Sequence, residues 1–546
     1  MVPVELFSRV GFRQRLPVVA GVSKKAGTMR AIFRIIGAIA LVASGVSAKN
    51  WIVSPAGLTT GAATKESPLD VYTAVQSAAP GDSILLQDGT YDLATTIKID
   101  SLNSGSATQR KYLGAAKGAR PVFDFSKQAY GSSNRGIELK GSYWTIFGIE
   151  IKNAGDNGIK LEGNHNRIER CVFHHNGDSG IQLGFAHETE NPDGIRCAYN
   201  EIINCDSYAN FDWGTLGGNA DGFACKMHNG KGNVFRGCRA WHNSDDGWDL
   251  YETDWPVEIT ECWSWHNGDQ TDFNDIYLTK AGKKMSSFSG NGNGIKLGGN
   301  GTGGSSKGQH VVTRCVAFNN RFKSLKGFDQ NSHKGGVIVK NSTAWNNGYN
   351  FMFEDDASGS TNEFSNNVSF SPKNGSGWEF SSGAILKNNS WNLTGVTASA
   401  ADFVDTTEAA AGAPRQADGS LPQNGFARLA KGSGLIDKGT PVGLTFAGAA
   451  PDLGAFEYGA ISDVAKRPRV RTLTRNGRDL MMPSDRTGVI SLEILDLTGR
   501  KVRNRSAEIL SGTARFPGAL EGLSEGMWIV RIQGDGEGWV ERVTAP

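Results

Sequence analysis

The sequence predicts an all-β protein: a parallel β-helix, which is a solenoid of stacked coils, followed by a small C-terminal β-sandwich domain. Two observations predict the solenoid: a unit that recurs from about residue 166 to 392, and residue columns that this unit keeps in register. A third observation predicts the second domain. From Arg467 the composition shifts, and the segments 488–502 and 526–534 alternate like short strands.

The repeat unit is a β-rich run with a small residue, followed five positions later by an asparagine. Its copies start 24 to 34 residues apart, with one interval of 53 that implies an insertion. Each copy is too short to bury its own hydrophobic face, so the copies must stack. The clearest copies are NRIERCVFHHN (166–176), NEIINCDSYAN (200–210), NVFRGCRAWHN (233–243), VEITECWSWHN (257–267), HVVTRCVAFNN (310–320) and VIVKNSTAWNN (337–347).

Stacking places equivalent residues of successive coils about 4.8 Å apart. The small residues then form a buried column, and we interpret its cysteines as packed thiols rather than disulfides, because in-register Cβ atoms lie beyond the usual span of a disulfide. The asparagines form an amide ladder at a turn. A helical solenoid is the rival architecture, but no stretch keeps a 3.6-residue period. The columns are Cys171, Cys205, Cys238, Cys262, Cys315 and Ser342, and Asn176, Asn210, Asn243, Asn267, Asn320 and Asn347.

Segments outside the repeats complete the predicted organisation. Residues 51–57 and 83–93 are expected to be opening strands, residues 67–78 a short helix that closes the end of the solenoid, and residues 432–459 a Gly/Pro-rich closing segment. The predicted domains are a leader and signal peptide at 1–48, with the signal proper at about 29–48, the β-helix at 49–458, a linker at 459–480 and the C-terminal domain at 481–546.

The leader predicts export. From Met29, two arginines precede an apolar stretch and a Val-Ser-Ala ending before Lys49, as in a secretory signal peptide. Whether Met1 or Met29 is the start stays open. The net charge of +2 argues against a nucleic-acid partner, and no apolar run is long enough to span a bilayer. We expect a secreted monomer.

A second alignment, on a glycine, locates the candidate chemistry. Asp221 and Asp246 precede this glycine in neighbouring coils, Asp245 adjoins Asp246, and Asp249 takes the position two after the glycine, which should face solvent. Lys296 takes the Asp249 column in the next coil. Asp-Gly is also a common turn dipeptide, and Lys160, in that column three coils earlier than Asp249, is interpreted as a solvent-facing lysine. The aligned segments are NGIKL (157–161), SGIQL (179–183), DGFAC (221–225), DGWDL (246–250), NGIKL (293–297), KGFDQ (326–330) and SGWEF (376–380).

Four carboxylates this close repel one another unless a cation neutralises them. Because they bring oxygen ligands without histidine or cysteine, calcium is favoured over zinc.

The segment NADGFACKMHNGKGNVFRGCRAWHNSDDGWDLYE (219–252) closely resembles polysaccharide lyase family 9, whose members are right-handed parallel β-helices. Residues 67–91, KGFDQN and AAPDLGAFE match the same family, so the resemblance covers about 50–458. It implies that Asp221, Asp245, Asp246 and Asp249 bind calcium and that Lys296 is the catalytic base. The chain departs from the family in a longer connection, 268–292, before that lysine.

The resemblance implies a calcium-dependent pectate lyase that cleaves α-1,4-linked galacturonan by β-elimination to unsaturated oligogalacturonides. Lys226 is a candidate for contacting substrate carboxylates, with a plain surface lysine as the alternative. Rhamnogalacturonan is the alternative substrate, because the family also contains rhamnogalacturonan lyases. A glycoside hydrolase that uses paired acids and a non-catalytic polysaccharide-binding β-helix are two further candidate functions.

The C-terminal segments LEILDLTGRKV and GMWIVRI resemble the sorting domains that direct secretion through a type IX-like pathway of certain Gram-negative bacteria. The resemblance implies an extracellular protein that engages this secretion machinery. Whether the mature protein is released or held at the cell surface stays open, as do endo or exo cutting and tolerance of methyl esters.

Overall fold

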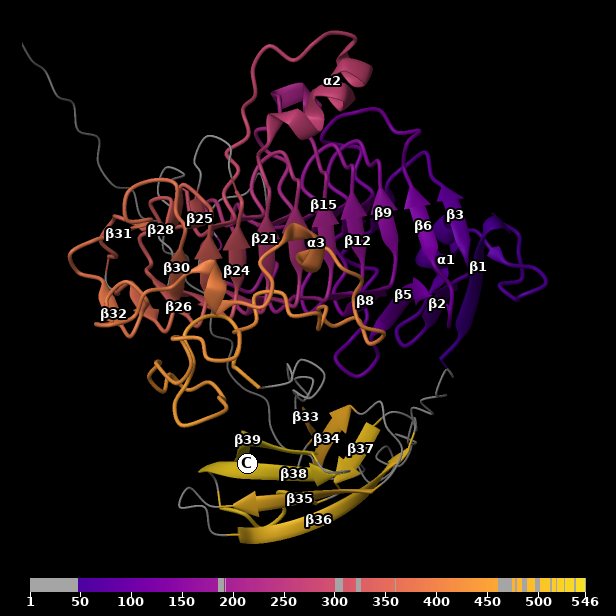
Figure 1. Ribbon diagram of the computed structural model, residues 1–546. Coiled ribbons are helices and arrows are strands. Elements are labelled where there is room, and N and C mark those ends of the chain that lie inside the picture. The colour runs from indigo at the N-terminus through magenta and orange to yellow at the C-terminus, as the bar shows by residue number, and fades with distance from the viewer. Residues whose placement is uncertain are drawn as a thin grey trace, which may run out of the picture. The chain divides into compact units, whose positions relative to one another are not determined.

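The computed structural model confirms the parallel β-helix. It describes residues 48–545 apart from 185–190, 192, 300–307, 321–325, 359, 460–473, 477–478, 484–488, 496–500, 511–512, 517, 525 and 535–536. The predicted signal peptide therefore lies outside the described residues, except Ala48. Three parallel sheets, here called sheets A, B and C, run side by side along the solenoid (Figure 1).

Each complete coil contributes one short strand to each sheet, and sheet A has one further strand at each end, β1 and β32. Sheet A consists of β1 (Asn50–Leu58), β2 (Ser83–Leu86), β5 (Lys111–Ala115), β8 (Trp144–Phe147), β11 (Arg167–Glu169), β14 (Glu201–Ile203), β17 (Asn233–Arg236), β20 (Val257–Thr260), β23 (His310–Thr313), β26 (Val337–Lys340), β29 (Glu363–Ser365) and β32 (Ile385–Lys387). Sheet B consists of β3 (Gly89–Asp92), β6 (Pro121–Asp124), β9 (Glu150–Lys152), β12 (Val172–His174), β15 (Asp206–Tyr208), β18 (Arg239–Trp241), β21 (Trp263–Trp265), β24 (Val316–Phe318), β27 (Thr343–Trp345) and β30 (Val368–Phe370). Sheet C consists of β4 (Ile97–Ile99), β7 (Ile137–Leu139), β10 (Ile159–Leu161), β13 (Ile181–Leu183), β16 (Phe223–Cys225), β19 (Trp248–Asp249), β22 (Ile295–Lys296), β25 (Lys326–Asp329), β28 (Tyr349–Phe353) and β31 (Trp378–Phe380).

Both predicted columns exist. All seven cysteines are buried free thiols, five of them stacked in the predicted column. The asparagine side chains form a continuous ladder in which each amide donates to the next carbonyl oxygen, for example Asn243 Nδ2 to Asn267 Oδ1 at 3.1 Å. Each backbone N–H also donates to the next side chain, as from Asn243 N to Asn267 Oδ1 at 3.1 Å. The ladder thus satisfies polar groups that would otherwise be buried without partners.

One left-handed residue forms the corner on each side of sheet B. The residue before each column cysteine has positive φ, as in Arg170 (56°) and Glu261 (55°), and so does the residue before each ladder asparagine, as in His242 (51°) and His266 (53°). A single residue with positive φ bends the chain sharply enough to end one short strand and begin the next. The side chains at these corners are free to be polar because they lie at the outer edge of the coil.

The predicted opening elements are present. Helix α1 (Val71–Ser77) begins at Asp70, whose side chain accepts a hydrogen bond from Thr73 N at 3.0 Å, and it contacts β1 at one end of the solenoid (Figure 1). Among the described residues, none of the helices is long and apolar enough to cross a membrane.

The segment after β32, residues 388–458 and here called the strap, includes nearly all of the predicted Gly/Pro-rich closing segment 432–459. It carries the 3-10 helix η3 (Ala400–Asp402) and helix α3 (Glu408–Ala411) and runs back over the outer face of sheet B (Figure 1). The physical reason is an apolar stripe on that face. Trp263, Phe318 and Trp345 would be exposed without the strap, and Phe403 and Phe426 cover them.

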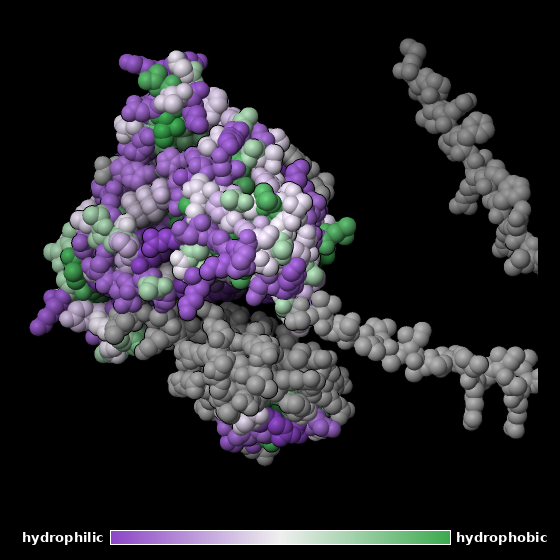
Figure 2. Space-filling model, turned by 90° about the vertical axis from the view of Figure 1, so that its right-hand side faces the viewer, coloured by the Kyte–Doolittle hydropathy of each residue, from purple (hydrophilic) through white to green (hydrophobic). Residues whose placement is uncertain are grey.

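The 53-residue interval contains the predicted insertion, residues 268–292. It forms the 3-10 helix η2 (Gln270–Phe273) and helix α2 (Asn274–Ala281) and projects at the top of Figures 1 and 2. Phe273, Tyr277 and Phe288 of the insertion pack with Phe211 into a small separate core. The 3-10 helix η1 (Trp213–Thr215) adjoins this core, which holds the insertion against the coils.

The C-terminal region is a seven-stranded antiparallel sheet with its own core around Leu492, Phe516 and Val530. Its first strand starts at Thr474, inside the predicted linker 459–480. The strands are β33 (Thr474–Asn476), β34 (Asp479–Pro483), β35 (Val489–Leu495), β36 (Lys501–Leu510), β37 (Thr513–Phe516), β38 (Gly526–Gly534) and β39 (Glu537–Ala545), in the order β33-β34-β37-β36-β35-β38-β39.

Candidate functional site

The candidate residues lie on three successive strands of sheet C. The register pairs Ala224 of β16 with Asp249 of β19, and Asp249 with Lys296 of β22. Alternation in each strand turns Phe223, Trp248 and Ile295 into the core, where all three are fully buried. Asp249 and Lys296 therefore project from the opposite face, one coil apart.

Asp221 and Asp246 share a turn position immediately before their strands. Gly222 N donates to Asp246 O at 2.9 Å, and Asp246 N donates to Asp221 Oδ1 at 3.2 Å. A glycine is needed after Asp221 because a Cβ on Gly222 would come within 2.8 Å of Gly247 O. The tight turn thus brings the two carboxylates together across the coils.

The structure brings together three of the four predicted aspartates. One carboxylate oxygen from each of Asp221, Asp245 and Asp246 lies within 4.8 Å of the others, and all three residues are buried. Asp249 lies next to this group rather than in it. Its Oδ2 is 3.2 Å from Lys226 Nζ, and its Oδ1 is 3.1 Å from Lys296 Nζ.

Two lysines face these carboxylates. Lys296 Nζ lies 3.0 Å from Asp246 Oδ2, and Lys226 Nζ lies 2.8 Å from Asp221 Oδ2. Both lysine side chains are buried, so their ammonium groups are compensated by carboxylates rather than by water. Lys226 is therefore not a plain surface lysine.

The charges leave an excess of carboxylates. Burial raises the pKa of Asp221 to about 8; Lys226 opposes this rise, and Asp249 and Asp246 add to it. Burial and its neighbours Asp246 and Asp221 also raise the pKa of Asp245 well above its ordinary value. Burial raises the pKa of Asp249 too, but Lys296 and Lys226 outweigh it and leave that pKa low.

The end of the insertion and the residue that follows it fix two of the carboxylates. Asn291 N donates to Asp245 Oδ1 at 2.5 Å, and Asn293 N donates to Asp246 Oδ1 at 2.8 Å. On the other side, Ser179 Oγ donates to Asp221 Oδ2 at 3.0 Å. The sequence analysis missed these three contacts. Ser179 and Asn293 precede the aligned glycine in SGIQL and NGIKL, and this shared column with Asp221 and Asp246 was the signal that could have identified them; the contact of Asn291 comes from the insertion and has no such signal.

The prediction that the column of Asp249 and Lys296 faces solvent was wrong. The side chains of Asp249, Lys296 and Lys160 are all less than a tenth exposed. Burial lowers the pKa of Lys160 to about 8, and its Nζ has no hydrogen-bond partner within the described part of the chain. Asp246 and Asp249 contact Lys296, and Asp249 also contacts Lys226, so these charged side chains cover one another.

Asp329 extends the same column by one coil. It pairs with Lys296 in the register and lies 3.1 Å from Lys326 Nζ. The sequence segment KGFDQ contained this residue, and its place two after the glycine was the signal that could have identified it.

The donor set fits a hard divalent cation. Asp221, Asp245 and Asp246 present oxygen atoms alone, bring one oxygen each within 4.8 Å of the other two, and have fewer ammonium neighbours than carboxylates. Calcium accepts such carboxylate oxygens in an irregular arrangement, whereas zinc prefers imidazole or thiolate. The cluster therefore fits calcium.

Comparisons with known proteins point in the same direction. Residues 51–367 match the model of the family described as "Pel9A-like, right handed beta helix region". Pectate lyase L of Dickeya chrysanthemi is 40% identical over 426 residues, which cover 76% of this chain and 92% of that protein.

Two solved structures resemble the β-helix. The crystal structure of pectate lyase Pel9A has a TM-score of 0.66 and 37% identity, covering 76% of this chain and 98% of that one. A rhamnogalacturonan lyase has a TM-score of 0.59 and 25% identity, covering 70% of this chain and 96% of that one. The C-terminal antiparallel sheet lies beyond the matched family region.

Proposed function

The chain belongs to the Pel9A-like, right-handed β-helix family, and from this membership we propose that it is a calcium-dependent pectate lyase. The proposed reaction cleaves α-1,4-linked galacturonan by β-elimination and releases unsaturated oligogalacturonides. One observation carries the proposal. Lys296 Nζ lies within hydrogen-bond distance of Asp246 and Asp249, at the border of the buried group Asp221, Asp245 and Asp246.

We assign calcium binding to Asp221, Asp245, Asp246 and Asp249. When bound, calcium would neutralise these carboxylates and stabilise the negative charge that develops on the substrate carboxylate. Asn291 N and Asn293 N hold Asp245 and Asp246 in place by their hydrogen bonds. The insertion therefore supports one proposed metal ligand, Asp245, directly through Asn291.

Lys296 is the proposed base. In its neutral form, Nζ takes the proton from C5 of the galacturonate, which lies α to the carboxylate. The electron pair of the C5–H bond forms the C4=C5 double bond while the C4–O4 bond breaks. O4 leaves with that bond pair and takes a proton from solvent. Asp246 and Asp249 position the amine, one on each side.

Lys226 is proposed to bind a substrate carboxylate. It carries the second ammonium group of the site, between Asp221 and Asp249. A substrate carboxylate near Asp249 would meet this positive charge, and the two lysines then have different tasks: Lys226 binds, and Lys296 transfers the proton.

The test is product formation from polygalacturonate, followed by the ultraviolet absorbance of the new conjugated double bond. The full chain should form this double bond in the presence of calcium and should not form it in the presence of EDTA. Lys296→Ala should lose at least a thousandfold in kcat while calcium still raises its thermal stability, because the ligands remain. Absorbance that persists in Lys296→Ala would remove Lys296 from the role.

A matched control lies in the same column. Lys98 lies in β4 and is exposed. It pairs with Glu138, which pairs with Lys160, so Lys98 belongs to the column that continues to Asp249 and Lys296. Lys98→Ala should leave the rate unchanged. Hydrolysis with saturated products would support the paired-acid alternative, and retention of the polysaccharide without cleavage would support a binding module.

Rhamnogalacturonan is the second candidate substrate, because a rhamnogalacturonan lyase shares the fold at 25% identity. Both reactions begin at a galacturonate C5 proton, so the proposed residues would serve either. Parallel assays with the two polysaccharides decide between them.

We also propose that the protein is exported, through the signal sequence at 29–48 and the C-terminal domain as a sorting signal. The substrate supports this proposal, since pectate is a polymer of the plant cell wall. Removing residues 467–546 should leave the lyase inside the producing Gram-negative cell, which fractionation of cells and medium would measure.

A further inference from the structure

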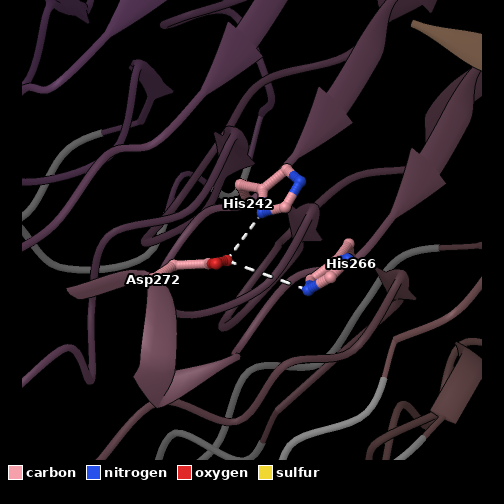
Figure 3. A group of neighbouring side chains, drawn as sticks. All are labelled: His242, His266 and Asp272. Atoms are coloured by element: carbon pink, nitrogen blue, oxygen red, sulfur yellow. Dashed lines mark hydrogen bonds and ion pairs between the residues drawn. The ribbon is translucent and has the colours of Figure 1, made fainter. Parts of the chain in front are cut away.

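A second group of metal-binding side chains lies at the corner after sheet B. His242 and His266 occupy the left-handed corner position in consecutive coils, directly after β18 and β21. Their rings stack with centroids 4.1 Å apart and an angle of 26° between the planes. Figure 3 shows both rings beside Asp272, which comes from η2 of the insertion.

Donor atoms from four residues converge at this corner. His242 Nδ1 lies 2.6 Å from Asp272 Oδ2, and His266 Nε2 lies 4.0 Å from the same oxygen. Asp269 Oδ2 lies 3.3 Å from His266 Nε2. These separations bracket the roughly 3.3 Å expected between ligand atoms around a tetrahedral zinc ion with bonds of about 2.0 Å.

The strap supplies an orienting carboxylate behind the site. Glu408 Oε2 lies 3.0 Å from His266 Nδ1, and Asn319 Nδ2 donates to Glu408 Oε1 at 2.5 Å. A carboxylate that accepts the hydrogen of one ring nitrogen is the usual support of a metal-bound histidine. It places the proton on Nδ1 and leaves the lone pair of Nε2 directed at the two aspartates.

That arrangement requires a positive charge at Nε2. A lone pair facing the Asp269 and Asp272 carboxylates is repulsive, so either a proton or a metal ion must lie between them. The side chains of His242, His266 and Asp272 are 32%, 19% and 26% exposed. An ion can therefore reach the site from solvent.

We propose that His242, His266 and Asp272, with Asp269 as the fourth ligand, bind a divalent transition metal of the zinc type. Two imidazoles and carboxylates suit zinc, and they contrast with the all-oxygen cluster on sheet C. This site joins three parts of the β-helix: two coils through the histidines, the insertion through the aspartates, and the strap through Glu408.

The consequence concerns the calcium ligands. The insertion starts at the zinc site with Asp269 and Asp272 and ends with Asn291, which donates to Asp245, just before Asn293, which donates to Asp246. A metal ion at its start would fix the insertion at both ends. Zinc would thereby stabilise the segment above the sheet C aspartates without taking part in the reaction.

The test is zinc titration of the full-length, untagged chain by isothermal calorimetry, with calcium present throughout. One zinc ion per chain should bind, calcium should not displace it, and zinc should raise the thermal unfolding midpoint. Cobalt in place of zinc should give the visible absorption of a tetrahedral site. His242→Ala/His266→Ala should abolish all these signals, and Asp272→Asn should weaken zinc binding at least tenfold.

His175 provides the matched control. It occupies the same corner column two coils before His242, with φ of 57°, and it contacts His174 rather than an aspartate of the insertion. His175→Ala should keep zinc binding and the cobalt spectrum. Two results would overturn the proposal: no zinc bound to the unaltered chain, which leaves His266 as an imidazolium between Glu408 and Asp269, or equal zinc binding by the double variant.

Discussion

At the scale of single residues, Asp249 has an unusual place between two ammonium groups. Lys226 and Lys296 each contact one of its oxygens, while each of the three clustered aspartates contacts one lysine or none among the described residues. The same carboxylates that would bind calcium therefore set the charge of the proposed base. Burial alone would lower the pKa of Lys296, but Asp246 and Asp249 hold that pKa well above its ordinary value.

This charge arrangement predicts an alkaline pH optimum. Below its pKa, each pH unit multiplies the neutral fraction of Lys296 by about ten, so activity should rise with pH between about pH 6 and pH 9. Calcium binding would draw charge from the aspartates and shift the rise toward lower pH. Initial rates at saturating calcium measure this profile.

If a carboxylate with an ordinary pKa were the base in place of Lys296, the pH profile of the rate would differ. The rate would then be flat over that pH range, and Lys296 would lose its proposed role. Lys296→Arg is the control, since its guanidinium stays protonated at every pH tested and should give no activity at any point of the profile.

At the scale of elements, the asparagine ladder links the coils at one corner. Asn243 Nδ2 donates to Asn267 Oδ1, and Asn210 Nδ2 donates to Asn243 Oδ1 at 2.9 Å. All three side chains are fully buried. Each amide is therefore both donor and acceptor in a dry environment, where an unpaired polar group is costly.

Asn243→Ala should therefore be strongly destabilising. It removes the Oδ1 that accepts from both Asn210 N and Asn210 Nδ2, and the buried backbone N–H that is left without its acceptor costs about 1–3 kcal/mol of the free energy of unfolding. Denaturant unfolding of the full chain measures the loss. Asn50→Ala, at the exposed start of β1, should stay within about 0.5 kcal/mol of the unaltered protein; an equal loss in both variants would contradict a role of the ladder.

At the scale of the whole β-helix, the strap is fastened by a buried ionic group. Asp206 of sheet B accepts from Arg239 Nη2 at 2.7 Å and from Arg415 Nη2 of the strap at 2.7 Å. Arg239 Nη1 also donates to Ala411 O of the strap at 2.9 Å. These contacts join residues about 170 to 210 positions apart in the sequence.

This buried ionic group of Asp206, Arg239 and Arg415 predicts that acid pH weakens the attachment of the strap to sheet B. Burial raises the pKa of Asp206, but Arg415 and Arg239 outweigh it and lower that pKa to about 2. A carboxylate with a lowered folded-state pKa stabilises the fold above its unfolded value near 4. This stabilisation, about 2 kcal/mol, is lost as the pH falls from about 4 to about 2.

Asp206→Asn should remove this pH dependence and lower stability at neutral pH, because it leaves two buried guanidinium groups without a carboxylate. Unfolding at about pH 7 and pH 3 measures both effects. Asp92→Asn is the control, since Asp92 forms an exposed ion pair with Lys127 and should change little. The same acid-induced loss in Asp206→Asn as in the unaltered chain would assign the lability to other groups.

The sequence by itself determined the coil register. Regular spacing aligned the cysteines, the ladder asparagines, Asp221 with Asp246 and Asp249 with Lys296, because stacked coils preserve any period that the chain keeps. Sequence also marked the insertion by a break in that period. It could not show that the Asp249 column is buried, since alternation gives the face of a residue but not what covers that face.

Only the tertiary structure decided what the non-repeating segments contact. The insertion returns Asn291 to Asp245, and the strap carries Glu408 to His266. The histidines themselves were visible before the ladder asparagine in two successive copies, but their carboxylate partners were not. Those contacts arise from packing between distant segments without periodicity, so no spacing in the sequence records them.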